Sequence, residues 1–379
     1  MGRGLIFFLL AMSAPRKVLI CSVGYGQGHH AAAAALAEEW ECRGATVRIC
    51  DPCALARPRL FAVTRAFYGF CVRRAPWLWG VTYAQTDTAN WRKAVDMPLL
   101  GAVKTKLEEL LREEQPDVVV CTYPLYAFML DALRGEGHFH GRYALVVTDA
   151  LEISRPWMQS AAPLVVVPDM RSAEKVRAQF GLSELLVQPL GFPVRREFRP
   201  GSLSGVPTQQ NLRIVFGAYR STRDVARSVR ALLRAFPAAH VTLLSGARAC
   251  RFSRLLHPEC VAGQVEVLAT TERMAALFAE SHLYIGKAGA ATMFECYAAR
   301  LPMLVNFALP GQEQGNAELL QHDGAGRFAE TPAEIVLNVQ HLLQDGAAEW
   351  QRMRAGMDSA SYDGAATRIV DETERRFFS

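Results

Sequence analysis

Short apolar runs alternate with helical patterns along the first half of the chain. Each run is hydrophobic at almost every position, which is typical of parallel strands buried on both faces of a sheet. An alanine-rich helix is predicted at 31–40, between the first two runs. Strand, helix and strand in repetition predict a doubly wound parallel sheet. The predicted strands are 17–23, 46–50, 117–122, 143–148 and 164–168.

The pattern breaks at 199–211 and then restarts. The break holds two prolines, two glycines, two serines and a threonine, so it predicts an interdomain linker. The fold class is therefore α/β, with two Rossmann-like, doubly wound domains that face each other across a cleft. Beyond the linker we predict a helix at 222–236 and strands at 212–216, 240–245, 265–268, 283–285 and 303–307.

The predicted organisation has five parts. In the N-terminal extension 1–16, an apolar run at 5–10 is too short to span a bilayer. That run either forms the core of a signal peptide or precedes a true start at Met12. The other parts are a first domain at 17–198, the linker at 199–211, a second domain at 212–346 and a helical tail at 347–379 that could cross back onto the first domain.

Composition narrows the class of protein only slightly. The chain has 379 residues, 50% of them hydrophobic, and a net charge of +5, which suits two globular domains and is weak evidence for an anionic partner. Nine cysteines without regular spacing argue against a disulfide framework and for a reducing compartment. Cys50 and Cys53 form a C-x-x-C. No second pair follows at zinc spacing, so buried or idle thiols are favoured over a metal or redox site.

The first candidate binding loop follows the first predicted strand. Gly24, Gly26 and Gly28 lead into a helix whose N-terminus offers free N–H groups to an anion. A dinucleotide site is the rival interpretation, because Asp51 ends the second strand, where a ribose-binding acid would lie. The spacing G-x-G-x-G differs from the dinucleotide fingerprint G-x-G-x-x-G, and a simple tight turn also fits.

His29 adds chemistry to this loop. It lies in the first turn of the helix, where the helix N-terminus disfavours the protonated imidazole and keeps the side chain neutral and basic. A neutral histidine at the mouth of a cleft suits a general base for a hydroxyl nucleophile. The alternative is that His29 only caps the helix.

A second loop, 286–292, has the same strand-to-helix position in the second domain. Its N–H groups could hold a diphosphate, with Lys287 adding positive charge. Glu295, one turn further on, could accept two hydrogen bonds from a ribose diol. The alternative is a capping box, because Thr292 and Glu295 have T-x-x-E spacing. The candidate ligands in this loop are Gly286, Lys287, Ala288, Gly289 and Thr292.

A polar loop follows the next strand, at 310–316. It contains Gln312, Glu313 and Asn316 between glycines, and a group of amides and a carboxylate is typical of hydroxyl recognition, hence of a sugar. The loop is predicted to emerge at the carboxyl edge of the sheet, where open α/β sheets bind ligands.

With these segments in view, the chain resembles the monogalactosyldiacylglycerol synthases and processive diacylglycerol glucosyltransferases. More distantly it is similar to MurG, the peptidoglycan lipid-linked N-acetylglucosamine transferase. The resemblance runs from about residue 17 to residue 326. It implies a GT-B fold and an inverting, UDP-sugar-dependent hexosyltransferase. The acceptor it implies is a membrane lipid, diacylglycerol first, and the product a β-glycosyl glycolipid.

The resemblance also implies roles for the candidate residues. His29 would activate the acceptor hydroxyl, and Asp149, the second residue of a Thr-Asp pair at the end of a strand, would lie beside it. The resemblance implies that the loop 286–292 binds the donor diphosphate and that Glu295 binds the uridine ribose. It also implies that Gln312 and Glu313 bind the sugar hydroxyls, and Asn316 completes that motif.

The chain departs from the family pattern in two places. Ala290 and Ala291 stand where the family has Pro-Gly. After the strand 212–216 the family has a glycine-rich loop, whereas this chain reads Gly-Ala-Tyr-Arg-Ser. Gly217 and Arg220 of this loop are still predicted to contact the donor, with Arg220 supplying charge where backbone N–H groups are lost.

The segment 55–83 has no acidic residue and interleaves arginines with aromatic residues. This mixture suits the headgroup region of an anionic bilayer. An aromatic core helix and a nucleic-acid groove are the alternatives. The resemblance implies acceptor and membrane contact in this part of the chain, so it favours a membrane surface and no nucleic acid. The predicted membrane residues are Arg65, Arg73, Arg74, Trp77 and Trp79.

The implied reaction uses a UDP-sugar as co-substrate and no metal or other cofactor. No D-x-D occurs in the chain, and the helix N-terminus with Lys287 would meet the diphosphate charge instead. The expected location is cytoplasmic, peripheral on the inner face of the cell membrane. A MurG-like N-acetylglucosamine transfer, a UDP-sugar epimerase and a non-catalytic UDP-sugar-binding membrane scaffold stay open as alternatives.

Overall fold

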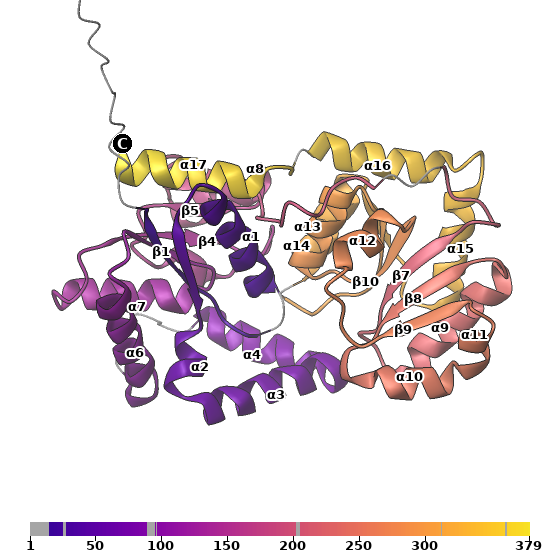
Figure 1. Ribbon diagram of the computed structural model, residues 1–379, viewed down its shortest axis with the longest axis horizontal. Helices are drawn as coiled ribbons and strands as arrows, with labels where there is room; N and C mark the ends of the chain where they lie inside the picture. The colour runs from indigo at the N-terminus through magenta and orange to yellow at the C-terminus, as the bar shows by residue number, and fades with distance from the viewer. Residues whose placement is uncertain are drawn as a thin grey trace, which may run out of the picture.

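The computed structural model describes residues 15–25, 28–88, 95, 97–201, 205–311, 313–360 and 362–379. Two six-stranded parallel sheets, each flanked by helices, form the two halves of the chain (Figure 1). This confirms the predicted pair of doubly wound α/β domains. Most of the predicted N-terminal extension lies outside the described residues, as do Gly26 and Gln312.

The first half contains β1 (Lys17–Cys21), α1 (Gly28–Cys42), β2 (Thr46–Cys50), α2 (Pro52–Ala56), α3 (Pro58–Arg74), α4 (Pro76–Thr88), α6 (Pro98–Glu114), β3 (Val118–Cys121), α7 (Pro124–Gly135), β4 (Arg142–Val146), the 3₁₀ helix η1 (Arg155–Met158), β5 (Val165–Val167), α8 (Met170–Phe180) and β6 (Val187–Pro189). The second half contains β7 (Arg213–Gly217), α9 (Thr222–Ala235), β8 (His240–Leu244), the 3₁₀ helix η2 (Gly246–Arg248), α10 (Ala249–Leu255), α11 (His257–Val261), β9 (Val265–Leu268), α12 (Met274–Ala279), β10 (Leu283–Lys287), α13 (Ala290–Ala299), β11 (Met303–Phe307), α14 (Gln314–His322), β12 (Gly326–Phe328), α15 (Pro332–Leu343), α16 (Ala348–Ala360) and α17 (Ala365–Phe378).

The strands of the first sheet lie in the order β2-β1-β3-β4-β5-β6. Neighbouring residues of a strand enter different hydrophobic clusters, since Leu19 and Val119 belong to one and Ile20 and Val120 to another. Burial on both faces explains the unbroken apolar runs in the sequence. The sequence does not predict β6, because Val-Gln-Pro contains no apolar run.

The second sheet has the order β12-β11-β10-β7-β8-β9. Here too a three-residue strand, β12, escapes prediction, because Gly-Arg-Phe has no strand-like pattern. In a parallel sheet the carboxyl ends of all strands lie along one edge. The loops after β7, β10 and β11 therefore emerge together, as do the loops after β1 and β4 in the first sheet.

The two halves meet along α1 and α13. Small side chains on α1 allow this close approach. Ala33 and Leu36 pack on the first sheet, whereas Ala32 joins a cluster that contains Ala291 and Phe294 of α13. The alanine-rich sequence of α1 thus suits a helix that is covered on two sides.

The last helix returns to the first half of the chain. α17 packs against α1, and Arg43 forms ion pairs with Asp371 (2.7 Å) and Glu374 (3.0 Å) across that contact. Ile369 and Val370 are buried in a cluster of the first sheet. In Figure 1, α16 and α17 follow the upper edge of the molecule, and α3 and α4 follow the lower edge.

Candidate active site

The glycine loop after β1 is held by a carboxylate from the next strand. Asp51 Oδ2 accepts a hydrogen bond from Gly24 N (2.9 Å). Its other oxygen accepts bonds from Ala54 N (3.0 Å), as the N-cap of α2, and from the Tyr126 hydroxyl (2.9 Å). The acid that a dinucleotide site would offer to ribose therefore serves as a structural anchor. Gly28 begins α1.

His29, the second residue of α1, is buried with 8% of its surface exposed. Its Nδ1 lies 2.8 Å from the Thr122 carbonyl oxygen and 2.8 Å from Thr148 Oγ1. A carbonyl oxygen can only accept, so Nδ1 must carry the proton and Nε2 is the basic nitrogen. The ring is thereby fixed in the tautomer that a proton acceptor needs.

The electrostatics of His29 favour the neutral form. Burial lowers the pKa of His29 to about 4. The hydrogen bond to the Thr122 carbonyl opposes this shift, whereas the charge of His30 lowers the pKa slightly further. The sequence prediction of a neutral imidazole attributes this to the helix N-terminus, whereas desolvation is the larger cause in the structure.

Asp149 follows Thr148 at the carboxyl end of β4 and is buried. Its Oδ2 accepts a hydrogen bond from the indole Nε1 of Trp157 (3.0 Å), whose ring centroid lies 6.2 Å from that of His29. The Thr-Asp pair and His29 are thus brought together. The sequence gives no local signal for Trp157, because it lies in the short helix η1, eight residues beyond the carboxylate it contacts.

The loop after β10 leads into an open helix N-terminus. α13 begins at Ala290 with Gly289 as its N-cap, no side chain caps it, and its first turn has no acidic residue. Thr292 lies inside the helix, so the capping-box alternative is wrong. The first-turn N–H groups of Ala290, Ala291 and Thr292 have no intrahelical carbonyl to bind, which makes this end of α13 suitable for an anion.

Lys287 lies at this helix N-terminus in an ion pair with Glu313 Oε1, while Glu313 Oε2 accepts a bond from Leu309 N (3.1 Å). Burial would lower the pKa of Lys287, but the Glu313 carboxylate outweighs it and the pKa rises above its usual value. A Cβ on Gly289 would lie 3.1 Å from Lys287 Nζ, a tight contact with the end of the lysine side chain.

The loop after β7 uses its backbone N–H groups internally as the loop after β10 does, where Ala288 N donates to Phe307 O (3.0 Å) and Gly289 N to Lys287 O (2.9 Å). After β7, Ala218 N donates a hydrogen bond to Leu244 O (2.9 Å) and Tyr219 N donates one to Gly217 O (3.0 Å). A glycine-rich loop would direct these N–H groups at a phosphate. The Arg220 guanidinium donates to the carbonyls of Asn306 (3.3 Å) and Glu330 (3.1 Å).

The helix that follows this loop is also closed. Ser221 caps α9, and Asp224 adds a carboxylate to its first turn. Of the N-termini of α9 and α13, that of α13 is therefore the one open to an anion.

Gly217 and Gly286 have a packing role. A Cβ on either glycine would lie 2.5 Å from the Tyr284 side chain, so both strands need glycine where this ring crosses them.

Glu295 is half-buried on α13 and has no hydrogen bond or ion pair within the described part of the chain. Burial raises the pKa of its carboxyl to about 8, with Arg195 opposing that shift and Glu197 adding to it. A ligand that donates hydrogen bonds would relieve this desolvation. The sequence prediction that Glu295 binds a ribose diol stays a prediction.

Asn316 joins the two halves. Its Oδ1 accepts a hydrogen bond from Ala150 N (3.1 Å), and its Nδ2 donates to Ala288 O (2.9 Å). The residue next to Asp149 is thus connected to the loop next to Lys287 through a single buried amide.

The segment 55–83 forms helices with two different faces. Arg65, Arg74 and Trp77 are exposed. Trp79 is half-buried and stacks edge-on against Tyr68 (4.7 Å between ring centroids) on the inner face of α3. The backbone of Arg73 lies in the last turn of α3, which ends at Arg74, and the Arg73 side chain lies outside the described residues.

The pKa of Tyr68 shows which charged groups lie near the inner face of α3. Burial raises it, and the charges of Lys287, Glu313 and Asp149 also act on it. The inner face of α3 therefore lies near charged groups of both halves of the chain.

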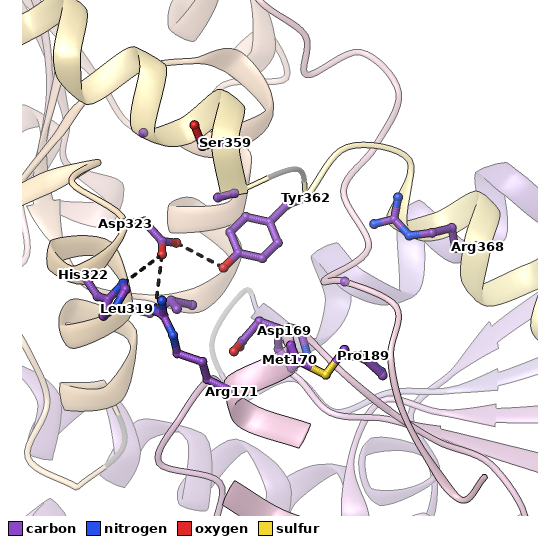
Figure 2. Close-up of a pocket in the computed structure, with 14 residues that line it drawn as sticks. Asp169, Met170, Arg171, Pro189, Leu319, His322, Asp323, Ser359, Tyr362 and Arg368 are labelled. Atoms are coloured by element: carbon purple, nitrogen blue, oxygen red, sulfur yellow. Dashed lines mark hydrogen bonds and ion pairs between the residues drawn. The ribbon is translucent and has the colours of Figure 1, made fainter. Parts of the chain in front are cut away.

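A cavity of about 520 Å³ lies elsewhere at the junction of the halves, between the start of α8 and the end of α14 (Figure 2). Asp323 accepts bonds there from the hydroxyls of Tyr297 (2.8 Å) and Tyr362 (3.1 Å) and lies 3.5 Å from Arg171. None of the predicted site residues lines this cavity. The polar side chains of this cavity form hydrogen bonds and an ion pair with one another, and these link different segments of the chain.

The described residues contain neither a metal-binding cluster nor a membrane-spanning helix. No group of three or more His, Cys, Asp or Glu side chains there could hold a metal ion. No helix in the same part of the chain is long and apolar enough to cross a bilayer.

Two family models match the chain. Residues 29–194 match monogalactosyldiacylglycerol (MGDG) synthase, and residues 224–368 match the glycosyltransferase family 28 C-terminal domain. The processive diacylglycerol beta-glucosyltransferase of Staphylococcus carnosus is 26% identical over 63% of this chain, and the chain spans 62% of that relative. The protein of the same name from Bacillus cytotoxicus is 24% identical over 94% of this chain and 92% of its own length.

Solved structures share the fold. MurG of Acinetobacter baumannii superposes with a TM-score of 0.58 at 16% identity, covering 95% of this chain and 100% of that one. A UDP co-structure of MnaA from S. aureus gives a TM-score of 0.61 at 11% identity, covering 95% of this chain and 96% of that one.

The paired sheets and the two matched domains define a glycosyltransferase of the GT-B fold. The chain is similar to the monogalactosyldiacylglycerol synthases over residues 29–194 and to processive diacylglycerol glucosyltransferases over most of its length.

Proposed function

We propose that the protein transfers a hexose from a UDP-sugar to diacylglycerol with inversion, giving a β-glycosyl diacylglycerol. The observation that carries the proposal is His29, a buried and neutral imidazole with Nε2 as its basic nitrogen. The Asn316 amide joins its neighbourhood to the open N-terminus of α13. The relatives named above are diacylglycerol beta-glucosyltransferases, which supports this acceptor and makes glucose the first sugar to test.

The donor is expected to bind along the second half of the site. Its diphosphate would accept bonds from the first-turn N–H groups of α13, next to the Lys287 ammonium. Glu295 would accept bonds from the ribose hydroxyls, and the loop of Gln312 and Glu313 would face the sugar. Arg220 already donates to two carbonyls, so the diphosphate depends on α13 and Lys287 in this account.

In the reaction, the acceptor hydroxyl gives its proton to His29 Nε2 as its oxygen attacks the anomeric carbon. The bond between that carbon and the diphosphate oxygen breaks, and UDP leaves with the electron pair. The helix N-terminus and Lys287 stabilise its developing charge. Asp149, held by the Trp157 indole, lies beside the base and is a second group able to receive the proton.

The test is an assay of the purified protein with labelled UDP-sugars and lipid acceptors that include diacylglycerol. We expect a labelled glycolipid whose anomeric proton shows a β-linkage. UDP-sugar binding without transfer to any lipid, or consumption of UDP-sugar without an acceptor, would contradict the proposal.

Donor affinity should depend on pH through Glu295. The carboxyl is protonated below about pH 8 and accepts ribose hydrogen bonds best when ionised. Affinity for UDP-glucose is therefore expected to rise with pH, by up to about tenfold per unit between roughly pH 6.5 and 8. Calorimetry in buffers of different ionisation enthalpy would also detect a released proton. Glu295→Gln is the matched control and should bind with no pH dependence; a flat profile in the parent would contradict the assignment.

The outer face of α3 and α4 is the proposed membrane contact. It exposes Phe67 (45%), Phe70 (51%) and Trp77 (69%) beside the arginines Arg65 and Arg74. Apolar rings among cations suit the headgroup region of an anionic bilayer. We propose that the protein is peripheral on the cytoplasmic face of the cell membrane, with this surface against the lipid and the inner face of α3 toward the site.

Reversing two of these charges should release the protein from vesicles. Arg65→Glu with Arg74→Glu is expected to weaken binding to anionic vesicles by roughly 25-fold or more, because each cation near such a surface contributes about fivefold and reversal adds repulsion. The loss should shrink as salt increases. Co-sedimentation measures it. Arg352→Glu with Arg375→Glu makes the same change of charge on α16 and α17, on the opposite edge, and should bind like the parent. Equal losses in both variants would refute the surface.

A further inference from the structure

A single amide connects the acceptor side of the site to the diphosphate loop. Asn316 has 1% of its surface exposed. Its oxygen accepts from Ala150 N (3.1 Å) in the first half, and its nitrogen donates to Ala288 O (2.9 Å) in the second half. Both ends of the amide are thus used between protein segments, 166 and 28 residues away in sequence.

The residue before it makes the same contact tighter. A Cβ on Gly315 would lie 2.4 Å from Ala150 O and 2.6 Å from Glu152 N. The first turn of α14 is therefore seated against the turn that follows Asp149, at a distance that only glycine permits. That turn is also held from its own side, because Leu151 N donates to Ser172 Oγ (2.9 Å).

Three consecutive residues after β4 make three different contacts. Thr148 Oγ1 lies 2.8 Å from His29 Nδ1, the Asp149 carboxylate accepts from Trp157, and Ala150 N donates to Asn316. Planar peptide units join these three residues and each is held by a hydrogen bond, so a displacement of one is expected to disturb the others. A shift of the diphosphate loop at Ala288 would reach the imidazole through this short path.

We infer that Asn316 is a positioning residue, which transmits the state of the diphosphate loop to the groups that receive the acceptor proton. It does so in place of reading donor-sugar hydroxyls, because its amide is already engaged at both ends. The inference rests on the proposed function for the identity of the donor. Donor binding on α13 would fix the position of the Ala288 carbonyl, and the Asn316 amide would move with that carbonyl. The turn at 148–150, which is bonded to Asn316, would then position His29 and Asp149 for the acceptor.

Trp157 offers a readout that a merely structural role would not move. Its indole donates to Asp149 Oδ2, so a shift of the turn changes its environment. In protein labelled with 5-fluorotryptophan, the Trp157 fluorine resonance, assigned through Trp157→Phe, should move when UDP is added. In Asn316→Ala we expect UDP affinity within about threefold of the parent, kcat reduced by roughly 10- to 100-fold, and no UDP-induced movement of that resonance.

A second variant disturbs the same contact by adding a Cβ next to the Ala150 backbone. Gly315→Ala keeps the amide but forces the first turn of α14 away from Ala150, so the same loss of kcat and of the resonance shift is expected. Glu318→Ala, on the exposed face of α14, is the control and should behave like the parent. If either variant fails to fold, the other variant and the UDP response of the parent still decide the matter.

Two results would overturn the inference. One is a loss of UDP-sugar affinity in Asn316→Ala that accounts for the whole loss of kcat/KM, because Asn316 would then be a donor ligand. The other is a parent protein that binds UDP while the Trp157 resonance stays in place. Failure to find any lipid product would count against the proposed function alone, since the UDP response is measured without an acceptor.

Discussion

Replacing His29 by glutamine is expected to lower kcat by roughly 10²- to 10⁴-fold, the usual contribution of a general base. Affinity for UDP should stay near that of the parent, because the hydrogen bonds of the His29 ring are made to Thr122 and Thr148 of the first half. Glutamine can still donate a hydrogen bond to the Thr122 carbonyl, so the packing around the site is largely preserved. Steady-state kinetics and calorimetry measure the two quantities.

The pH dependence of the parent gives a second test of the same assignment. Activity requires the neutral imidazole, and burial lowers the pKa of His29 from 6.5 to about 4. The acid limb of kcat at saturating substrates should therefore lie well below pH 6. The matched control is His30→Gln, which alters the neighbouring histidine and should keep most of the activity. Equal losses in both variants, or an acid limb near 6.5, would contradict His29 as the base.

The fold could be predicted because its strands carry a strong local signal. Central parallel strands buried on both faces are apolar at almost every position, so 303–307 is recognisable at its true bounds. The edge strands 46–50 and 265–268 are also predicted at their true bounds, although each contains a charged residue and exposed positions. The strands β6 and β12 have three residues each and depend on neighbours for their hydrogen bonds. Their sequences contain a proline or a glycine and an arginine, and no local rule would select them.

The positions of the site loops were predictable for the same reason, whereas their partners were not. A loop after a parallel strand must emerge at the carboxyl edge, which locates His29, Asp149 and Lys287. The contacts of these residues come from distant segments. Trp157 reaches Asp149 from a short 3₁₀ helix, and Asn316 reaches Ala150 across 166 residues. Sequence spacing carries no information about such pairs.

Tertiary contacts overturned one local interpretation and added a second cause to another. The T-x-x-E spacing fits a capping box, but α13 begins two residues before Thr292, where Gly289 can take the N-cap conformation. Gly217 and Gly286 are predicted to contact the donor, and this stays a prediction; in the structure both also make room for the Tyr284 ring. In each case the pattern identified a constrained residue, and the fold supplied a cause of the constraint.

Lys287→Met is expected to damage both stability and catalysis, for separate reasons. The substitution leaves the Glu313 carboxylate, with 5% of its side chain exposed, without its ion-pair partner. Removing one partner of a buried pair typically costs about 3–5 kcal/mol. It also removes the cation next to the diphosphate site, which should lower kcat by roughly 10²- to 10³-fold.

A double variant separates the two effects. Lys287→Met with Glu313→Gln removes both charges, while the glutamine oxygen can still accept the bond from Leu309 N. We expect this variant to regain most of the lost thermal stability and to remain as inactive as Lys287→Met, because no cation meets the leaving UDP. Glu313→Gln alone is the matched control: it keeps the ammonium, so any loss it shows measures the sugar-facing role of Glu313, and its activity should stay above that of the double variant. Thermal melting and kcat/KM with UDP-glucose measure the two properties. If the double variant regained activity along with stability, Lys287 would serve only to neutralise Glu313, and the leaving-group charge would have to be met by the helix N-terminus alone.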